Sequence, residues 1–355
     1  MAKILIKNGR IWDGNRFYFA DILTDGEYIS KIEDRIDDEA NYTFNATGMI
    51  VTPGLIDCHI HMQGTEPDRF GINPEMSTIP FGVTAAADAG GAHACEELTK
   101  HYLVKNVTFV RVPIRNNQPD FQSAERKLAL YPTTAIGLKV YFDTNSSEVT
   151  DIAPLAEICR YAKDHGLLVM VHCSNSPTPM SEILEVLNPG DILTHAFHGG
   201  VHTARDDDYK SMMEAKKRGV IIDAGFAGHI HTDFAVFRKA VSLGVLPDTI
   251  STDITRASAY MRGGRFGMTM CMSMAKEAGM EEADIFRAVT TTPARVLGKS
   301  AQWGHLAVGR KADIAVFQYG HEPFSLTDKA GNVMANPNSY RCKMTIANGI
   351  IVWRD

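Results

Sequence analysis

Two histidines one residue apart, His59 and His61, occur in the segment LIDCHIHMQG at positions 55–64. Side chains alternate between the two faces of a strand, so these imidazoles point the same way, about 6–7 Å apart along the backbone. Such a pair can supply two ligands of a metal site, or it can be two polar residues where a strand meets solvent. The pair alone does not decide between these interpretations, so further ligands must be sought elsewhere in the chain.

Four further side chains with metal-binding or acid–base chemistry stand in or at the end of apolar runs. They are Lys139, His172, His195 and Asp253. A single histidine at a strand end is most often a hydrogen-bonded structural residue. Six such residues, in the chain order expected of a barrel mouth, instead indicate one shared site, because the carboxyl ends of the strands in a parallel barrel meet on one face.

Lys139 lies inside the apolar run GLKVYF, residues 137–142. An unpaired ammonium buried in an all-parallel sheet is very costly, so something must neutralise it. A buried ion pair is one solution. The other is carboxylation of the neutral amine by CO2, which gives a carbamate (N6-carboxylysine) whose two oxygens can bridge two divalent cations. Four imidazoles and an aspartate directed at the same cavity favour the carbamate.

Eight apolar runs alternate with helical patterns along the middle of the chain and are expected to position these side chains. The runs cover residues 55–61, 82–90, 109–114, 137–142, 168–173, 191–197, 219–225 and 249–254. Continuous apolar strands that alternate with helices are typical of a parallel sheet covered on both faces. We therefore predict an α/β fold with a (β/α)8 TIM barrel over residues 53–302, whose active site lies at the carboxyl ends of the strands.

The two ends of the chain predict a second, smaller unit. Residues 3–11 and 343–351 share a strand, Asn-Gly, strand pattern, and Asn-Gly between β-rich runs is the strongest short hairpin signal. Further strand patterns occur in ADILTDGEYISKI and KADIAVFQY. We expect both termini to meet in one small β-sandwich domain built from residues 1–52 and 303–355.

Composition and charge favour a small-molecule partner. The 355 residues include 36 Lys and Arg and 42 Asp and Glu, a formal net charge of −6, with no basic block that would attract nucleic acid or an anionic membrane. The N-terminal segment lacks the pattern of a signal peptide, and no run reaches the ~18 apolar residues that span a bilayer. We expect a cytoplasmic protein, and assembly into a homo-oligomer stays open.

Six cysteines occur without a CxxC pair and are expected to be buried thiols. Cys58 and Cys173 each adjoin a candidate ligand in a strand and therefore face away from it. The methionine-rich segment at 268–280 is expected to be a core helix rather than a soft-metal site.

Taken together, these motifs resemble the amidohydrolase superfamily, in its binuclear metal subgroup with a carboxylated lysine. The resemblance runs over nearly the whole length, through VTPGLIDCHIH, the isolated Lys139, VMVHCS, GDILTHAF, TISTDI, TTTPARVLG and GHLAVGRKADIAVF. It implies one metal ion bound by His59, His61 and Asp253, a second bound by His172 and His195, and Lys139 as a ligand of both. Imidazole and carboxylate ligands suit Zn2+, with Mn2+, Fe2+ and Co2+ as alternatives.

The resemblance also implies a reaction. Two cations that share a water lower its pKa towards neutrality, and one of them can polarise a carbonyl, so a metal-bridging hydroxide would attack an amide or ester. Asp253 would accept a proton from the hydroxide and pass it to the leaving group. Within the superfamily the likeness is greatest to deacetylase-like and dihydroorotase-like enzymes. Deacetylation of a small acylated carboxylic acid is the predicted reaction, and opening of a cyclic amide is the alternative.

Basic residues in the expected loops are the candidates for binding a substrate carboxylate. The planar fork of arginine matches two carboxylate oxygens. The candidates are Arg115, His231 and Arg256, with His229, Arg262 and Arg265 in the same loops as His231 and Arg256.

Two rival interpretations remain: a deaminase of a nucleobase-like ring, and a non-catalytic relative. Mononuclear deaminases of the superfamily place a glutamate shortly after the strand-five histidine, whereas CSNSPTP follows His172 here. A non-catalytic relative that keeps the barrel for assembly would have lost ligands, and none of the six is missing.

Overall fold

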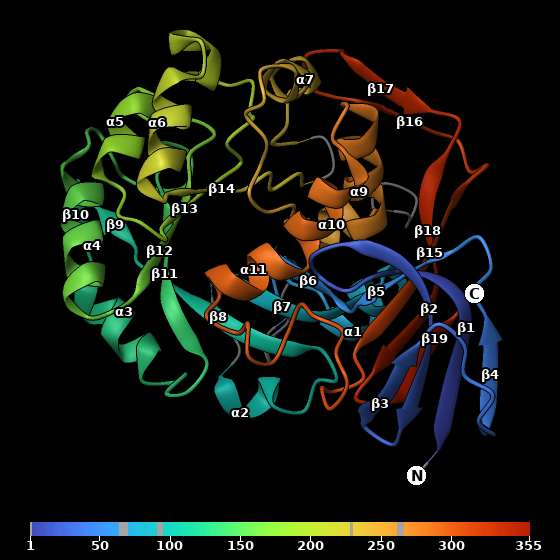
Figure 1. Cartoon of the computed structure of the whole chain (residues 1–355). Coiled ribbons are helices and arrows are strands. Elements are labelled where there is room, and N and C mark those ends of the chain that lie inside the picture. The colour runs from blue at the N-terminus through green and yellow to red at the C-terminus, as the bar shows by residue number, and fades with distance from the viewer. Residues whose placement is uncertain (1, 64–69, 91–94, 228–229, 261–265) are drawn as a thin grey trace.

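The protein is described from a computed structural model, which covers residues 2–63, 70–90, 95–227, 230–260 and 266–355. Two sheets dominate the molecule (Figure 1): a curled parallel sheet surrounded by helices, and a mixed sheet that joins the two ends of the chain. Within the described residues, no helix combines the length and apolar character needed to cross a membrane.

The parallel sheet carries the candidate ligands. Its order is β14-β13-β12-β11-β8-β7-β6, the reverse of chain order. The strands are β6 (Leu55–Ile60), β7 (Val83–Gly90), β8 (Lys105–Arg111), β11 (Ala135–Tyr141), β12 (Leu168–His172), β13 (Ile192–Thr194) and β14 (Ile221–Ile222). Most of their residues are buried on both faces, which explains the continuous apolar runs from which the strands were predicted. The predicted α/β class with a parallel sheet is confirmed.

The last three predicted strands are shorter than expected, and the first of them, β13, covers only Ile192–Thr194 of the run at 191–197. The run at 219–225 forms a strand only at β14, and the run at 249–254 forms isolated bridges from Thr249 to Asp223 and from Ile254 to Ile60. The Asp223 carboxylate accepts hydrogen bonds from the hydroxyls of Thr249 and Ser251, both at 2.7 Å. These side-chain bonds replace part of the regular ladder, and the segment still contacts both edges of the seven-stranded sheet.

Helices cover the outer face of the parallel sheet. They are α1 (Pro74–Thr78), α2 (Glu96–Thr99), α3 (Phe121–Leu128), α4 (Ala153–Asp164), α5 (Met180–Val186), α6 (Lys210–Arg218), α7 (Phe234–Ser242), α8 (Arg256–Tyr260), α9 (Met268–Glu277), α10 (Glu282–Val289) and α11 (Thr291–Val296), with 3-10 turns η1 (Ile79–Phe81) and η2 (Ala204–Asp207). Helix α6 ends at Gly219, whose φ of 93° is the left-handed conformation expected of a helix stop. Helix α4 precedes β12 and helix α6 precedes β14, in agreement with the expected alternation of apolar runs and helices.

The mixed sheet joins the N- and C-terminal segments. Its order is β19-β18-β15-β5-β1-β2-β3, and β4 also pairs with β1. The strands are β1 (Lys3–Trp12), β2 (Phe17–Asp25), β3 (Tyr28–Glu33), β4 (Tyr42–Asn45), β5 (Ile50–Pro53), β15 (Ile314–Gly320), β18 (Ser339–Ala347) and β19 (Ile350–Arg354). Two small hairpins complete the fold: β9 (Ile114–Arg115) with β10 (Gln118–Pro119), and β16 (Phe324–Thr327) with β17 (Val333–Asn336).

The two Asn-Gly pairs have different structures. Asn348 and Gly349 form the turn between β18 and β19, with φ values of 48° and 75°, as the hairpin signal predicted. The predicted hairpin at Asn8-Gly9 is wrong: this pair lies inside β1, where the register of pairing with β2 shifts. The reason is packing, because a Cβ on Gly9 would stand 2.5 Å from a methyl group of Val51, so the glycine permits the close approach of β5.

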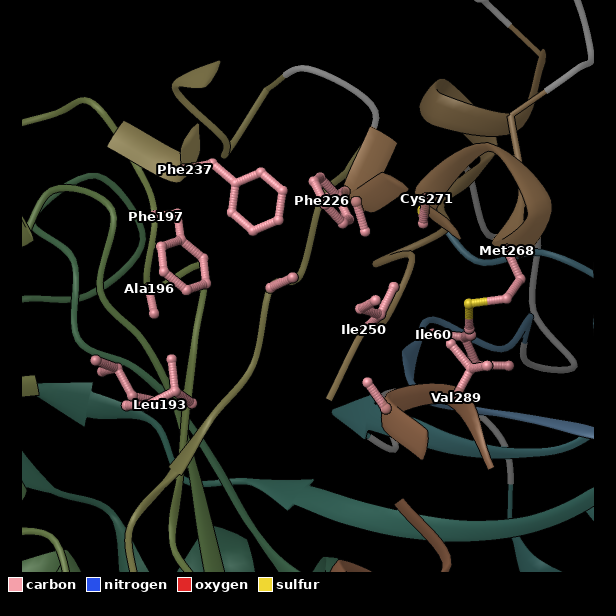
Figure 2. Packing of buried hydrophobic residues seen from close by; sticks show 14 of the residues in the cluster. Ile60, Leu193, Ala196, Phe197, Phe226, Phe237, Ile250, Met268, Cys271 and Val289 are labelled. Carbon is pink, nitrogen blue, oxygen red and sulfur yellow. The ribbon is translucent and has the colours of Figure 1, made fainter. Parts of the chain in front are cut away.

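A large apolar cluster fills the space between the sheet and helices α7, α9 and α10 (Figure 2). Phe237 of α7 packs edge-on against Phe197 and Phe226, with ring centroids 5.1 and 5.3 Å apart. The loops after β13 and β14 are thereby fixed to α7. Met268, Cys271 and Met272 of α9 are buried in the same cluster, which confirms that the methionine-rich segment is a core helix.

Candidate metal centre

The six predicted ligand residues gather at the carboxyl end of the parallel sheet. His59 and Lys139 lie within β6 and β11, His172 is the last residue of β12, and His61 and His195 follow β6 and β13. Asp253 comes from the segment that bridges β6 and β14, and its backbone N–H donates to the carbonyl of His59 at 2.8 Å. All six side chains are buried. The geometry therefore brings together residues up to about 200 positions apart in the sequence.

Potential ligand atoms form two adjacent groups, each within 4.8 Å. The first is His59, His61 and Asp253, and the second is His172, His195 and His231. His231 was considered in the sequence only as a substrate contact, because its HxH motif lies beyond the end of the seventh strand. No helical or strand periodicity encodes the path of that loop, so only the HxH motif itself could have drawn attention to it. Its partner His229 lies outside the described residues.

Asp253 lies between the two groups. Its Oδ1 is 3.2 Å from Nε2 of His59 and 3.0 Å from Nε2 of His61. Its Oδ2 is 3.7 Å from Nε2 of His195 and 4.0 Å from Nε2 of His231. Although it is buried, Oδ1 receives no hydrogen bond from any described residue. One carboxylate is thus positioned to serve both groups.

The tautomer of His59 is set by a buried hydrogen-bond chain. The Thr194 hydroxyl donates to Oδ2 of Asp223 at 2.7 Å, so its oxygen can accept the proton on Nδ1 of His59, 2.9 Å away. Nε2 of His59 then carries a lone pair that points at Oδ1 of Asp253. Two electron-rich atoms facing each other in a buried site repel, and a cation between them would relieve this repulsion.

His195 is oriented in a similar way. Its Nδ1 donates to the carbonyl of Gly225 at 2.6 Å, so Nε2 is free to bind a cation. His231 contacts the hydroxyl of Ser174 through Nδ1 at 3.0 Å. Both His195 and Asp253 have left-handed backbones, with φ of 60° and 46°. Such strain in non-glycine residues is stored mostly at functional sites, where surrounding contacts hold it.

Lys139 lies beside the first group. Its side chain is 0% exposed, and its Nζ is 3.2 Å from Nε2 of His59. It makes no ion pair with a carboxylate among the described residues. Burial lowers the pKa of Lys139 to about 8, an effect that the charges of Asp253 and Asp223 partly oppose. The buried ion pair considered as the alternative for this lysine therefore has no acidic partner in contact.

Burial also keeps the imidazoles neutral. It lowers the pKa values of His59, His172 and His195 well below their ordinary value, and neighbouring basic side chains lower them further. Neutral imidazole is the form that binds metal ions. The electrostatics of the pocket thus match the ligand chemistry expected from the sequence.

Three supporting residues were missed in the sequence: Thr194, Asp223 and Asp57. Asp57 accepts hydrogen bonds from the hydroxyl of Thr252 at 2.6 Å and from its backbone N–H at 3.1 Å. Burial raises the pKa of Asp57 to about 7. Asp57 and Asp223 could have been noticed in the sequence because each is a charged residue inside an otherwise apolar run. The same kind of signal identified Lys139.

Cys58 and Cys173 belong to neither ligand group of the described residues. Their thiols face Oδ1 of Asp223 and the carbonyl of Thr194, at 3.6 and 3.5 Å. All six cysteines are free, and five are buried. Cys95 is the exception, since it is only half-buried at the start of α2.

The predicted anion-binding residues are dispersed. Arg115 is exposed in β9. Together with Arg111 and Lys127 it lines a cavity of about 570 Å³, whose lining includes none of the six predicted metal ligands. Arg256 begins α8, and its backbone N–H donates to the carbonyl of Phe70, whose ring packs against His61 at 4.6 Å. Of the predicted substrate contacts among the described residues, His231 alone joins a ligand group. Arg262 and Arg265 lie outside the described residues.

A curled parallel sheet with histidine and aspartate ligands gathered at its carboxyl edge is the arrangement of a metal-dependent hydrolase. Residues 50–352 match the model of the amidohydrolase family, and the chain belongs to this family. A deacetylase from Agrobacterium fabrum is 29% identical over 314 residues, which cover 81% of this chain and 75% of that protein.

Two solved structures are similar over the whole chain. A dihydroorotase has a TM-score of 0.86 at 24% identity, covering 99% of this chain and 98% of its own. An adenine deaminase has a TM-score of 0.85 at 23% identity, covering 100% of both chains. At these identities the likeness concerns the fold.

Proposed function

We propose that this amidohydrolase holds two divalent metal ions and cleaves an amide or ester bond of a small acylated carboxylic acid, in the manner of a deacetylase. The observation that carries the proposal is the pair of adjacent ligand groups with Asp253 between them. The identity to the A. fabrum deacetylase supports removal of an acyl group. The imidazole-rich ligand set favours Zn2+.

The residues divide between the two ions as the sequence indicated. His59, His61 and Asp253 would hold one ion, and His172 and His195 the other. Bound ions would polarise the scissile carbonyl and make a water molecule nucleophilic at neutral pH. The His231 side chain is 23% exposed and 4.0 Å from Asp253, so we assign it to the open side of the second group, where a substrate would contact it.

Lys139 would serve both ions as a carbamate. The neutral amine forms an N–C bond to the carbon of CO2 and releases one proton to solvent, which converts the neutral side chain into an anionic one. Its complete burial, its contact with His59 and the absence of a described acidic partner support this modification.

Asp253 would move the proton. Its two oxygens face the two ligand groups, so it can take a proton from the attacking water on one side of the substrate carbonyl and give it to the leaving group. Its left-handed backbone fixes the direction of the carboxylate.

The architecture that serves this chemistry is, we propose, a complete (β/α)8 barrel over residues 53–302. The bridges of Thr249 and Ile254 to the two edges of the sheet support closure by residues 249–254. We further propose that residues 1–52 and 303–355 form a separate β domain, since their shared sheet has its own apolar cluster.

Opening of a cyclic amide is the second candidate, because it needs the same activated water and proton transfer and because the fold matches a dihydroorotase. Deamination has less support, since Cys173, Ser174 and Asn175 follow His172 and none is a carboxylate. Both alternatives can be assayed beside the first.

The test is a metal-defined activity screen. The zinc-loaded protein should contain about two ions per chain and release acid from N-acyl or O-acyl amino and hydroxy acids, presented as both enantiomers. Dihydroorotate, hydantoins and amino-heterocycles are assayed in parallel. A single bound ion with ammonia release from a heterocycle as the sole activity would contradict the proposal.

A further inference from the structure

A second cavity, of about 190 Å³, has His231 in its wall. We name it the His198 cavity; it is lined by Ser174, His198, Gly200, His231, Thr232 and Lys329, together with neighbouring loop residues. His231 belongs both to this wall and to the second ligand group. The cavity therefore adjoins the second ligand group through this side chain.

Two buried polar atoms in this wall have no partner among the described residues. They are Nε2 of His198 and Oγ1 of Thr232, on side chains that are 2% and 3% exposed. The backbone N–H of Gly200 donates to Nδ1 of His198 at 3.2 Å, so the proton of the neutral ring is on Nε2. Two residues of the wall thus carry an unpaired imidazole N–H and an unpaired hydroxyl. A buried donor left unpaired is unfavourable, and a ligand acceptor would remove this cost.

The charges around the cavity leave one cation available. Lys329, in the turn between β16 and β17, forms no ion pair with another described residue. Both acidic side chains at the rim are already satisfied. Asp233 caps α7 and pairs with Arg205 at 3.0 Å, and Asp328 accepts hydrogen bonds from four N–H groups of its own turn and of α7.

We propose that the His198 cavity binds the carboxylate of the substrate, with His198 and Thr232 donating hydrogen bonds and Lys329 supplying the opposite charge. This deepens the proposed function and rests on it. The cavity is smaller than the ~300–1,000 Å³ typical of drug-sized ligands, so it fits a carboxylate with a short carbon chain. It places the anion-binding site on the β13, β14 and β16–β17 loops rather than at Arg115 or Arg256.

Binding of N-acetylalanine and N-acetylalaninamide, measured by ligand-observed NMR on the Asp253→Asn protein, tests this assignment without turnover. The acid should bind at least about tenfold tighter than the amide, and Thr232→Val and Lys329→Met should each remove most of this preference. Thr108→Val, which deletes another buried hydroxyl without a described partner, and Lys210→Met, which removes an exposed charge, should leave it intact.

Equal binding of acid and amide, no binding of the acid, or an unchanged preference in both cavity variants would overturn the assignment. The same variants in the active protein separate this outcome from failure of the proposed function. If the protein prefers the carboxylate but hydrolyses no acyl compound, the cavity assignment stands and the proposed deacetylase activity is wrong. If the protein hydrolyses the acyl compounds but the ratio of KM for acid over amide is unchanged in Thr232→Val and Lys329→Met, the proposed activity stands and the cavity assignment is wrong.

Discussion

Lys139 and Thr194 illustrate two kinds of residue at this site. Lys139 could be identified from the sequence, because a lysine inside an apolar strand demands a neutralising partner. Thr194 could not be identified from the sequence, because it matters only through its hydrogen bonds to Asp223 and His59, which are distant from it in the chain. Residue type marks a ligand, whereas only the fold marks the group that orients it.

Replacing Lys139 by alanine removes the proposed carbamate. We expect kcat/KM to fall by about 10³-fold or more, with bound metal falling below two ions per chain. Acetate or propionate should restore part of the activity by supplying carboxylate oxygens in the vacated space. Lys210→Met controls for the loss of a lysine, and full activity in Lys139→Ala would remove the carbamate from the mechanism.

Thr194→Val keeps the volume of the side chain but deletes the acceptor for His59. Mutation of the hydrogen-bond partner of a metal-binding histidine typically lowers metal affinity by about 10–100-fold, and we expect zinc affinity to fall in that range. Competition with a chelator measures the change. Thr108→Val is the matched control, since that buried hydroxyl bonds to no described residue. An affinity equal in the two variants would show that Thr194 does not orient His59.

At the scale of elements, the apolar runs predicted the strands well up to β12 and less well from β13 onward. Periodicity could not show that the Asp223 carboxylate would collect the hydroxyls of Thr249 and Ser251 and shorten the ladder there. Nor could it show the left-handed backbones of His195 and Asp253, which depend on tertiary contacts. The missed features thus cluster at the loops that carry the chemistry.

Gly225, just after β14, is an element-level test of this packing. Its φ is 50°, and a Cβ there would stand 2.4 Å from Oγ1 of Thr194 and 2.7 Å from Nδ1 of His195. We expect Gly225→Ala to displace His195 and lower kcat/KM by about 10²-fold. Gly244→Ala is the control: the φ of Gly244 is 76°, but an added Cβ would meet nothing within 4 Å. This variant therefore measures the effect of backbone strain without displacement of a neighbouring side chain. Equal losses in both variants would assign the effect to strain alone.

At the scale of the whole molecule, the terminal sheet is attached by its first strand to helices around the parallel sheet. Trp12 of β1 is 0% exposed, donates from Nε1 to the Thr290 hydroxyl at 3.1 Å, and packs against Phe286 of α10. Arg10 adds an ion pair to Glu282 at 2.6 Å. These contacts join the segment before the first ligand-bearing strand to the helices after the last one.

Trp12→Ala should therefore destabilise the protein by about 3–5 kcal/mol, as expected for loss of a large buried aromatic side chain. Denaturant unfolding followed by fluorescence and by circular dichroism measures the loss. Trp353→Ala, at a position 37% exposed, should cost less than about 1 kcal/mol. Similar costs in the two variants would mean that the sheet does not stabilise the helices through Trp12.

The hydrogen bonds from Thr252 to Asp57 connect positions 195 apart in the chain, immediately beside Asp253 and His59. Contacts of such long range form late in folding, because much of the intervening chain must first be ordered. A nascent polypeptide that still lacks its final third has His59 and His61 but not Asp253, the third proposed ligand of the first ion. Under the proposed function, the first metal ion would therefore find all of its ligands only when synthesis has reached the final third of the chain.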